Sequence, residues 1–171
     1  MGWQEIDDWI SSPATPPDAE AVAKRLRYEQ ELGFPFSPQL ALWIDRFGAD
    51  MLGPGGLSEV DESNDPQGLL VRTTAHPEWV EMGWVPVAGD WCGNYYVVDT
   101  KLPSEPVYFI DSYEDVGVPA YVAASNFRLF VDLFSKHDRG ELPFHWPFAK
   151  TDTLTLDPEL ELISAPMPWD A

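Results

Sequence analysis

Few side chains in this 171-residue sequence have the type and spacing that metal binding or nucleophilic catalysis requires. The three histidines, His76, His137 and His145, share no metal-ligand spacing with one another or with Cys92, the one cysteine. No nucleophile elbow, phosphate-binding loop or dinucleotide-binding glycine pattern is present. Cys92, next to Trp91, is interpreted as a packed turn residue rather than a nucleophile. We therefore predict no metal and no cofactor, and we expect the protein not to be an enzyme.

Carboxylates are abundant, but their spacing defines no catalytic or calcium-binding pattern. Asp61, Ser63 and Asp65 have the spacing of the first ligands in a calcium-binding loop. However, Pro66 replaces the glycine that such a loop requires, and Arg72 stands where its bidentate glutamate should be. With 29 Asp and Glu residues, a pair at any chosen spacing arises by chance, so no acid–base dyad is assigned. An enzyme whose site leaves no recognisable motif stays open as an alternative.

Net charge is the strongest chemical signal in the chain, with 10 Lys and Arg against 29 Asp and Glu and a formal charge of −19. Binding to nucleic acid or to an anionic membrane requires clustered Lys and Arg that release counterions from the polyanion. We therefore predict neither nucleic-acid nor membrane binding. A basic protein partner is favoured, since opposite fields steer encounter and raise association rates. The alternative that the acidity only keeps the protein soluble stays open.

Cysteine content and the N-terminal sequence bear on the compartment. One cysteine excludes an internal disulfide and is typical of a reducing environment. Residues 1–8 are acidic and have neither the basic start nor the apolar run of a signal peptide. The longest apolar runs are far shorter than the roughly 18 residues of a membrane span. These features predict a cytoplasmic protein and leave its oligomeric state open.

The first part of the chain is predicted to be helical. After a short amphipathic N-terminal piece, Asp18 can cap a helix over about 18–32, which Gly33 ends. A second helix begins with Ser37 as cap and Pro38 at the first helical position. Its apolar residues recur at helical spacing: Leu40, Trp43, Ile44, Phe47 and Met51.

Short extended runs follow, separated by turn residues, and predict strands. They are Leu69–Thr73, Met82–Val87, Tyr95–Asp99 and Val107–Asp111. Because a parallel crossover needs a dozen or more residues, strands this close together are expected to pair antiparallel. Alternation places Tyr95, Val97 and Asp99 on one face of the sheet, and Tyr96 and Val98 then lie on the other. For Asp99 we favour a structural role, bonding turn amides, over contact with a partner.

A further helix and a C-terminal tail complete the predicted elements. Ser125 or Asn126 caps the helix, whose apolar face carries Phe127, Phe130, Val131 and Phe134. The tail predicts one or two edge strands, because leucines alternate in it: Leu154, Leu156, Leu160 and Leu162. Helices, then strands, then a helix predict an α+β fold. We expect a single domain with an antiparallel sheet of about four to six strands and helices packed mainly on one face.

An ordered set of motifs lies between Trp84 and Phe134. They are Trp84-Val85-Pro86-Val87, Gly93-Asn94-Tyr95-Tyr96-Val97-Val98-Asp99, Pro106-Val107-Tyr108-Phe109-Ile110-Asp111 and Ser125-Asn126-Phe127-Arg128-Leu129-Phe130. The set resembles the SUKH superfamily, the Smi/Knr-type domain. The upstream helix 37–47, followed by glycines, is similar to the family's first helix, although Asp45-Arg46-Phe47-Gly48 departs from the usual pattern. The resemblance covers roughly residues 37–136 and implies one domain over 1–171, with an N-terminal helical extension and a C-terminal strand or tail.

The resemblance implies a non-enzymatic binding domain. Many bacterial members of the superfamily are immunity proteins that bind and neutralise a cognate polymorphic toxin, often a nuclease. Other members act in cell-wall regulation or as adaptors. We therefore expect an immunity protein with a toxin domain as its partner, and a regulatory adaptor without a toxin partner is the alternative.

A partner-binding site is predicted at loops and turns that border the sheet, since loops carry binding more often than strand centres do. We predict an apolar anchor, Trp91, within an acidic rim formed by Glu59, Asp61, Glu62, Asp65 and Asp90. Trp84 and Trp91 flank a turn-rich strand end, where a core position and an interface position both stay open. In the alternative reading, 59–65 is only a solvated loop and Trp91 belongs to the core.

Overall fold

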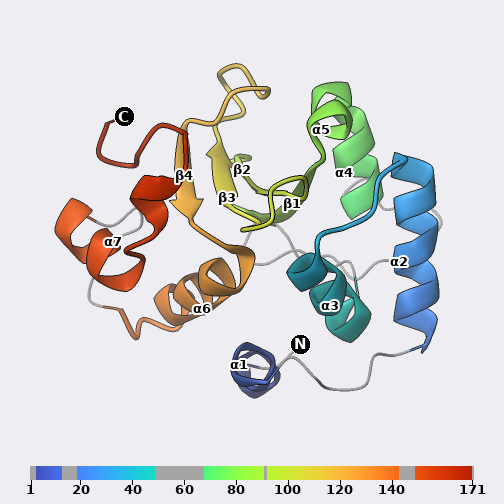
Figure 1. Ribbon diagram of the computed structural model, residues 1–171, viewed down its shortest axis with the longest axis horizontal. Helices are drawn as coiled ribbons and strands as arrows, with labels where there is room; N and C mark the ends of the chain where they lie inside the picture. The colour runs from blue at the N-terminus through green and yellow to red at the C-terminus, as the bar shows by residue number, and fades with distance from the viewer. Residues whose placement is uncertain (1–2, 13–18, 49–67, 91, 143–148, 171) are drawn as a thin grey trace.

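A four-stranded antiparallel sheet forms the centre of the computed structural model, which describes residues 3–12, 19–48, 68–90, 92–142 and 149–170 (Figure 1). Each strand pairs with the next one along the chain, so the spatial order equals the chain order. The strands are β1 (Trp84–Gly89), β2 (Tyr95–Asp99), β3 (Val107–Ile110) and β4 (Tyr121–Ala124). The predicted α+β fold with an antiparallel sheet is confirmed, and the number of strands lies within the expected range.

The helices of the described residues lie before and after the sheet in the chain. They are α1 (Trp3–Ser11), α2 (Ala19–Leu32), α3 (Pro38–Phe47), α4 (Leu69–Ala75), α5 (Pro77–Met82), α6 (Phe127–Asp138) and α7 (Lys150–Leu156), with the short 3-10 helix η1 (Leu160–Leu162). The predicted helices at 18–32, after Ser37 and after Asn126 are confirmed as α2, α3 and α6. Asn126 caps α6, because its side-chain oxygen accepts the N–H of Leu129 at 2.9 Å.

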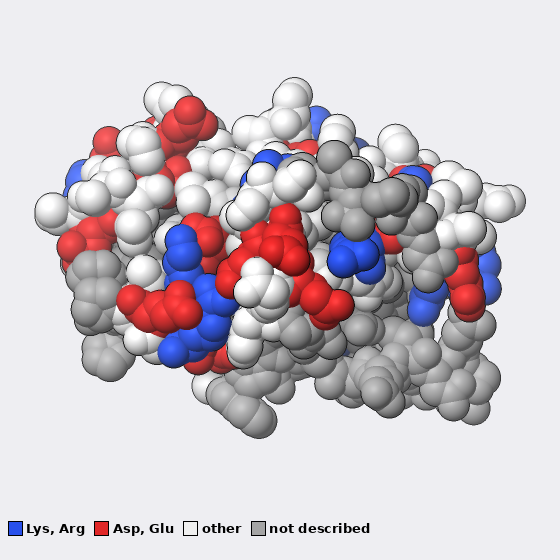
Figure 2. All heavy atoms as spheres, turned by 90° about the horizontal axis from the view of Figure 1, so that it is seen from below, with Lys and Arg blue, Asp and Glu red and all other residues white. Residues whose placement is uncertain are grey.

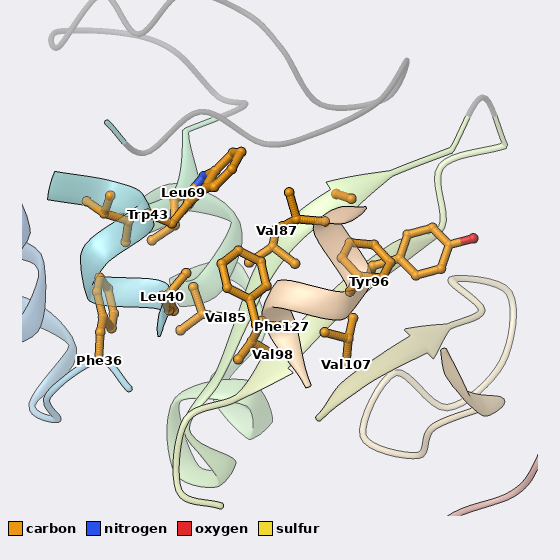
Figure 3. Close-up of a cluster of buried hydrophobic side chains, with 14 of the residues drawn as sticks. Phe36, Leu40, Trp43, Leu69, Val85, Val87, Tyr96, Val98, Val107 and Phe127 are labelled. Atoms are coloured by element: carbon orange, nitrogen blue, oxygen red, sulfur yellow. The ribbon is translucent and has the colours of Figure 1, made fainter. Parts of the chain in front are cut away.

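Most helices pack on one face of the sheet, as predicted. Tyr96 and Val98 of β2 point to this face and lie in one buried cluster with Phe127 and Phe130 of α6. Figure 3 shows Phe127 in the middle of this cluster, between Leu40 of α3 and Tyr96. Side chains of α1, α2 and α4 belong to the same cluster. The predicted alternation along β2 is therefore confirmed.

The opposite face of the sheet is covered by α5 and by the C-terminal segment. Val97 of β2 and Ile110 of β3 are fully buried there, against Trp79 of α5 and Leu160 of η1. Trp84 also lies in this second cluster, so the structure assigns it to the core. Two apolar layers therefore sandwich the sheet.

Of the predicted strands, one is wrong and another begins too early. The run Leu69–Thr73 is helix α4, in which Leu69, Arg72 and Thr73 are buried at helical spacing. The Thr73 hydroxyl donates to the carbonyl of Leu69 at 2.7 Å, so tertiary packing and local bonds override the strand preference of these residues. The run that begins at Met82 becomes a strand only at Trp84, because Gly83 adopts φ 73 and ends α5.

The C-terminal prediction is also wrong. The alternating leucines lie in α7 and η1, and they form no edge strand. Instead, the short strand β4, which the sequence pattern did not reveal, forms that edge of the sheet. The tail still protects the edge, since the Val122 N–H donates to the carbonyl of Pro166 at 2.8 Å and the Ser125 N–H donates to Asp157 at 2.7 Å.

A buried carboxylate joins the β2–β3 connection to the start of α3. Glu105 is 1% exposed and adopts a left-handed φ of 57°. Its side chain accepts the Ser37 hydroxyl at 2.8 Å and the N–H groups of Gln39 and Leu40 at 2.9 and 3.2 Å. Ser37 stands at the predicted cap position, but Glu105 rather than Ser37 satisfies the first amides of the helix.

Asp99 has the structural role favoured for it. One oxygen accepts the Lys101 N–H at 2.9 Å, and the other accepts the indole N–H of Trp84 at 3.3 Å. Burial, together with the charge of Asp99, raises the pKa of Tyr108 to about 12.

Alkaline pH is expected to destabilise the protein through Tyr108. Because the folded protein holds the phenol proton more tightly than the unfolded chain does, the contribution of this group is intact below its ordinary pKa of 10.0. It is lost as the pH rises toward about 12. Urea unfolding between pH 9 and pH 11.5 measures the decline. In Tyr108→Phe the decline should be shallower, and an equal decline in both proteins would contradict the assignment.

Candidate protein-binding surface

Asp90 is the one predicted binding residue that the structure places. Glu59, Asp61, Glu62, Asp65 and Trp91 lie outside the described residues. Asp90 lies in the β1–β2 turn, where one oxygen accepts the N–H groups of Cys92 at 2.8 Å and Asn94 at 2.9 Å. Its other oxygen accepts the side-chain amide of Asn94 at 2.9 Å. Asp90 thus holds the turn together while remaining partly exposed.

The β3–β4 loop lies directly beside this turn. The Asn94 side-chain oxygen accepts the backbone N–H of Ser112 at 3.0 Å and its hydroxyl at 3.2 Å. On the other side of the loop, the indole N–H of Trp79 donates to the Val116 carbonyl at 2.7 Å. The loop is therefore attached both to the β1–β2 turn and to α5, and it projects at the top of Figure 1.

Acidic side chains of the β3–β4 loop also stabilise its turns. Asp111 accepts the N–H of Tyr113 at 2.9 Å, and Asp115 accepts the N–H of Gly117 at 3.0 Å. At the end of the loop, the Ala120 N–H donates to the carbonyl of Phe109 at 2.9 Å, directly before β4 begins. These bonds give the loop a defined shape before any partner binds.

Tyr113 is the most exposed large hydrophobic side chain of the described residues, at 84%. Glu114 and Asp115 beside it are exposed, whereas Asp111 is partly exposed. We call Asp90, Asp111, Tyr113, Glu114 and Asp115 the acidic loop surface. Sequence reasoning missed its last four members. The available signal was three acidic residues within five positions, the first of them at the end of a predicted strand.

The carboxylates of the acidic loop surface form no ion pair among the described residues, whereas several carboxylates elsewhere do. Elsewhere, Arg25 binds Asp45 at 2.7 Å, and this bond is the main cause that raises the pKa of Arg25. Likewise, Lys136 binds Asp132 at 2.7 Å. The ion pairs formed among the described residues include none of the carboxylates of the acidic loop surface. Their negative charge therefore remains available to a partner.

The face on the side of α1 shows the opposite pattern. Figure 2 views this face from below and shows basic side chains lying directly beside acidic ones. Arg139, for example, pairs with Asp7 and Glu141, both at 2.9 Å. The hydrogen bond to Asp7 is the main cause that raises the pKa of Arg139. Arg139 thus matches two of the acidic side chains near this face.

Other kinds of site find little support in the described part of the chain. No group of three or more His, Cys, Asp and Glu side chains could hold a metal ion there. Within the same residues, no helix has the length and apolar character needed to cross a membrane. Cys92 lies in a turn as predicted, but it is exposed rather than packed.

Fold and surface together define a small α+β domain, built on an antiparallel meander, that carries unpaired carboxylates in the loops at one end of the sheet. The chain belongs to the SMI1 / KNR4 family (SUKH-1), whose sequence profile matches residues 17–133. The match spans α2 to β4 and most of α6, and it confirms the resemblance seen in the sequence motifs. No curated protein and no solved structure matches the chain significantly.

Proposed function

We propose that this protein is a non-enzymatic immunity protein, acting in the cytoplasm, that binds a basic toxin domain through the acidic loop surface. Domains of the SMI1 / KNR4 family are generally non-enzymatic immunity or regulatory proteins. The formal charge of −19 favours a basic partner over a polyanion, because opposite fields accelerate association.

The observation that carries the proposal is an exposed aromatic ring held among carboxylates that form no ion pair. Tyrosine is enriched at interface hot spots because it supplies a large amphipathic ring with few rotatable bonds. The hydrogen bonds of Asp111 and Asp115 order the loop around Tyr113 in advance. Binding therefore loses less conformational entropy than it would with a flexible loop.

The same chemistry favours a nuclease as the toxin. A protein that cleaves nucleic acid attracts phosphates with clustered Lys and Arg. Carboxylates of the acidic loop surface can pair with those cations, and the ring of Tyr113 can stack where a base would stack. A partner with these two properties would be blocked at the surface that it needs for its substrate.

The direct test is neutralisation of a toxin domain encoded next to the gene for this protein. We expect co-expression to restore growth and the two purified proteins to elute as one complex in size-exclusion chromatography. An unrelated toxin domain of similar charge serves as the control and should not be neutralised. A toxin that remains active and unbound would contradict the immunity role and favour a regulatory adaptor.

Charge neutralisation in the loop should slow association. In the triple variant Asp111→Asn, Glu114→Gln and Asp115→Asn, the side chains can still accept the loop amides, but three charges are lost. We expect the association rate at low salt to fall by about tenfold and the dissociation rate to change little. Stopped-flow or biosensor kinetics at low and high salt measure both rates.

A matched triple variant tests whether the effect depends on where the charges lie or only on how many are lost. Asp138→Asn, Glu159→Gln and Asp170→Asn remove the same charge from exposed residues outside the acidic loop surface. An equal slowing by both triple variants would show a general charge effect and exclude the loop as the docking site. The rim predicted from sequence alone can be tested in the same way, with Asp61, Glu62 and Asp65 changed to Asn, Gln and Asn.

A further inference from the structure

Helix α1 packs on the rest of the chain through a narrow apolar face. Its buried residues are Ile6 and Trp9, the latter 2% exposed. The Trp9 ring makes edge contacts with Trp43 of α3 at 5.0 Å and with Phe127 of α6 at 6.0 Å between ring centroids. Trp43 and Phe127 in turn contact each other at 5.9 Å. We call the surface that Trp43 and Phe127 present to Trp9 the aromatic groove.

The polar side of α1 is held by a residue that follows α6. Arg139 donates two hydrogen bonds to Asp7, at 3.0 and 2.9 Å, and its guanidinium lies 5.6 Å from the ring centroid of Trp3. The indole N–H of Trp9, in contrast, is buried and has no acceptor among the described residues. A buried unpaired N–H costs about 1–3 kcal/mol, so α1 is bound less tightly than its ring contacts alone imply.

Helix α1 depends on the rest of the domain for its structure. A helix of 9 residues is too short to be stable alone, so its structure depends on the groove. It lies outside the family-matched region 17–133, which contains both groove residues. In Figure 1 it lies below α6, at the opposite end of the molecule from the β3–β4 loop. The groove is therefore distinct from the acidic loop surface.

We infer that the aromatic groove is an exchangeable binding site for an amphipathic helix, and that α1 of a second copy of this chain can occupy it. The same ring contacts and the same Asp7–Arg139 pair form whether α1 comes from its own chain or from another. Charge complementarity favours this occupant, because α1 carries three acidic residues and no Lys or Arg, whereas Arg139 pairs with Asp7 and the Arg128 guanidinium lies 5.6 Å from the ring centroid of Trp9. Two copies can therefore meet here with less repulsion than their formal charge of −19 suggests.

A peptide of residues 1–12 tests the groove in the full-length protein. The substitution Trp9→Ala removes the indole ring from the aromatic groove and leaves Trp43 and Phe127 unchanged. We expect the labelled peptide to bind this variant at least about tenfold more tightly than it binds the wild type, and a Trp9→Ala peptide to lose that binding. Fluorescence anisotropy measures binding, and near-UV circular dichroism checks that the variant is folded. No preference for the folded variant would overturn the inference.

Self-association tests the second copy as the occupant. Wild-type protein refolded at millimolar concentration is expected to contain a dimer in size-exclusion chromatography with light scattering, and Trp9→Ala is expected to remove it. Absence of a dimer, or a dimer that persists in Trp9→Ala, would overturn this occupant. If Trp9→Ala does not fold, Arg139→Ala replaces it, because it weakens the hold on α1 and keeps the groove. The peptide should then bind Arg139→Ala more tightly than the wild type, and equal binding would contradict the exchange.

Discussion

Glu105→Ala is expected to lower the free energy of unfolding by about 3–5 kcal/mol, the largest stability change that we predict. The substitution removes a carboxylate that is 1% exposed and leaves two helix amides and a serine hydroxyl without their acceptor. Buried donors that lose their partner bear the full cost of desolvation. Urea unfolding followed by far-UV circular dichroism measures the change.

Three further variants separate the contributions of Glu105. Glu105→Gln keeps an acceptor and should cost less than Glu105→Ala. Glu105→Gly removes the strain of the left-handed φ of 57° but loses the same bonds, so it should remain strongly destabilising. Glu81→Ala, at an exposed position of α5, is the matched control and should change stability by less than about 0.5 kcal/mol. A Glu105→Ala protein as stable as this control would refute the capping role.

Tyr113→Ala is expected to weaken partner binding by at least about 2 kcal/mol, roughly thirtyfold in Kd, without lowering the thermal midpoint. The ring is 84% exposed, so its removal creates no cavity in the folded protein. Its backbone N–H still donates to Asp111 in the variant, so the loop keeps its shape. Isothermal titration calorimetry with the toxin domain and a thermal melt of the protein alone measure the two quantities.

Matched variants show whether the effect belongs to the site of Tyr113. Tyr113→Phe keeps the ring and should retain most of the affinity. Leu162→Ala removes another highly exposed apolar side chain, 79% exposed, from outside the acidic loop surface and should not affect binding. Unchanged affinity in Tyr113→Ala would exclude Tyr113 as an anchor, although the protein could still bind through another surface.

Sequence reasoning succeeded where local signals and burial agree. The helices α2, α3 and α6 combine apolar residues at helical spacing with start and stop residues such as Pro38 and Gly33, and all three were predicted. The two faces of strand β2 were predicted correctly, because successive side chains of a strand point to opposite faces and both faces of this strand are covered by an apolar layer. In α4, by contrast, the β-branched residues Val71 and Thr73 suggested a strand. The run is a helix in the structure, and its Leu69 packs into the main buried cluster. The periodicity of so short an apolar run cannot distinguish a strand from a buried helix.

The candidate site shows the same division. The sequence by itself determined the family, the net charge and the principal helices, since these depend on composition and on neighbours along the chain. Only the tertiary structure decided that Asn94 joins the β1–β2 turn to Ser112, which brings Asp90 beside the loop of Tyr113. Only the tertiary structure, too, placed Glu105 at the start of α3, 66 residues from Gln39 in the chain. Such pairs depend on how the chain folds back in space, and no periodicity in one sequence encodes a contact between segments so far apart.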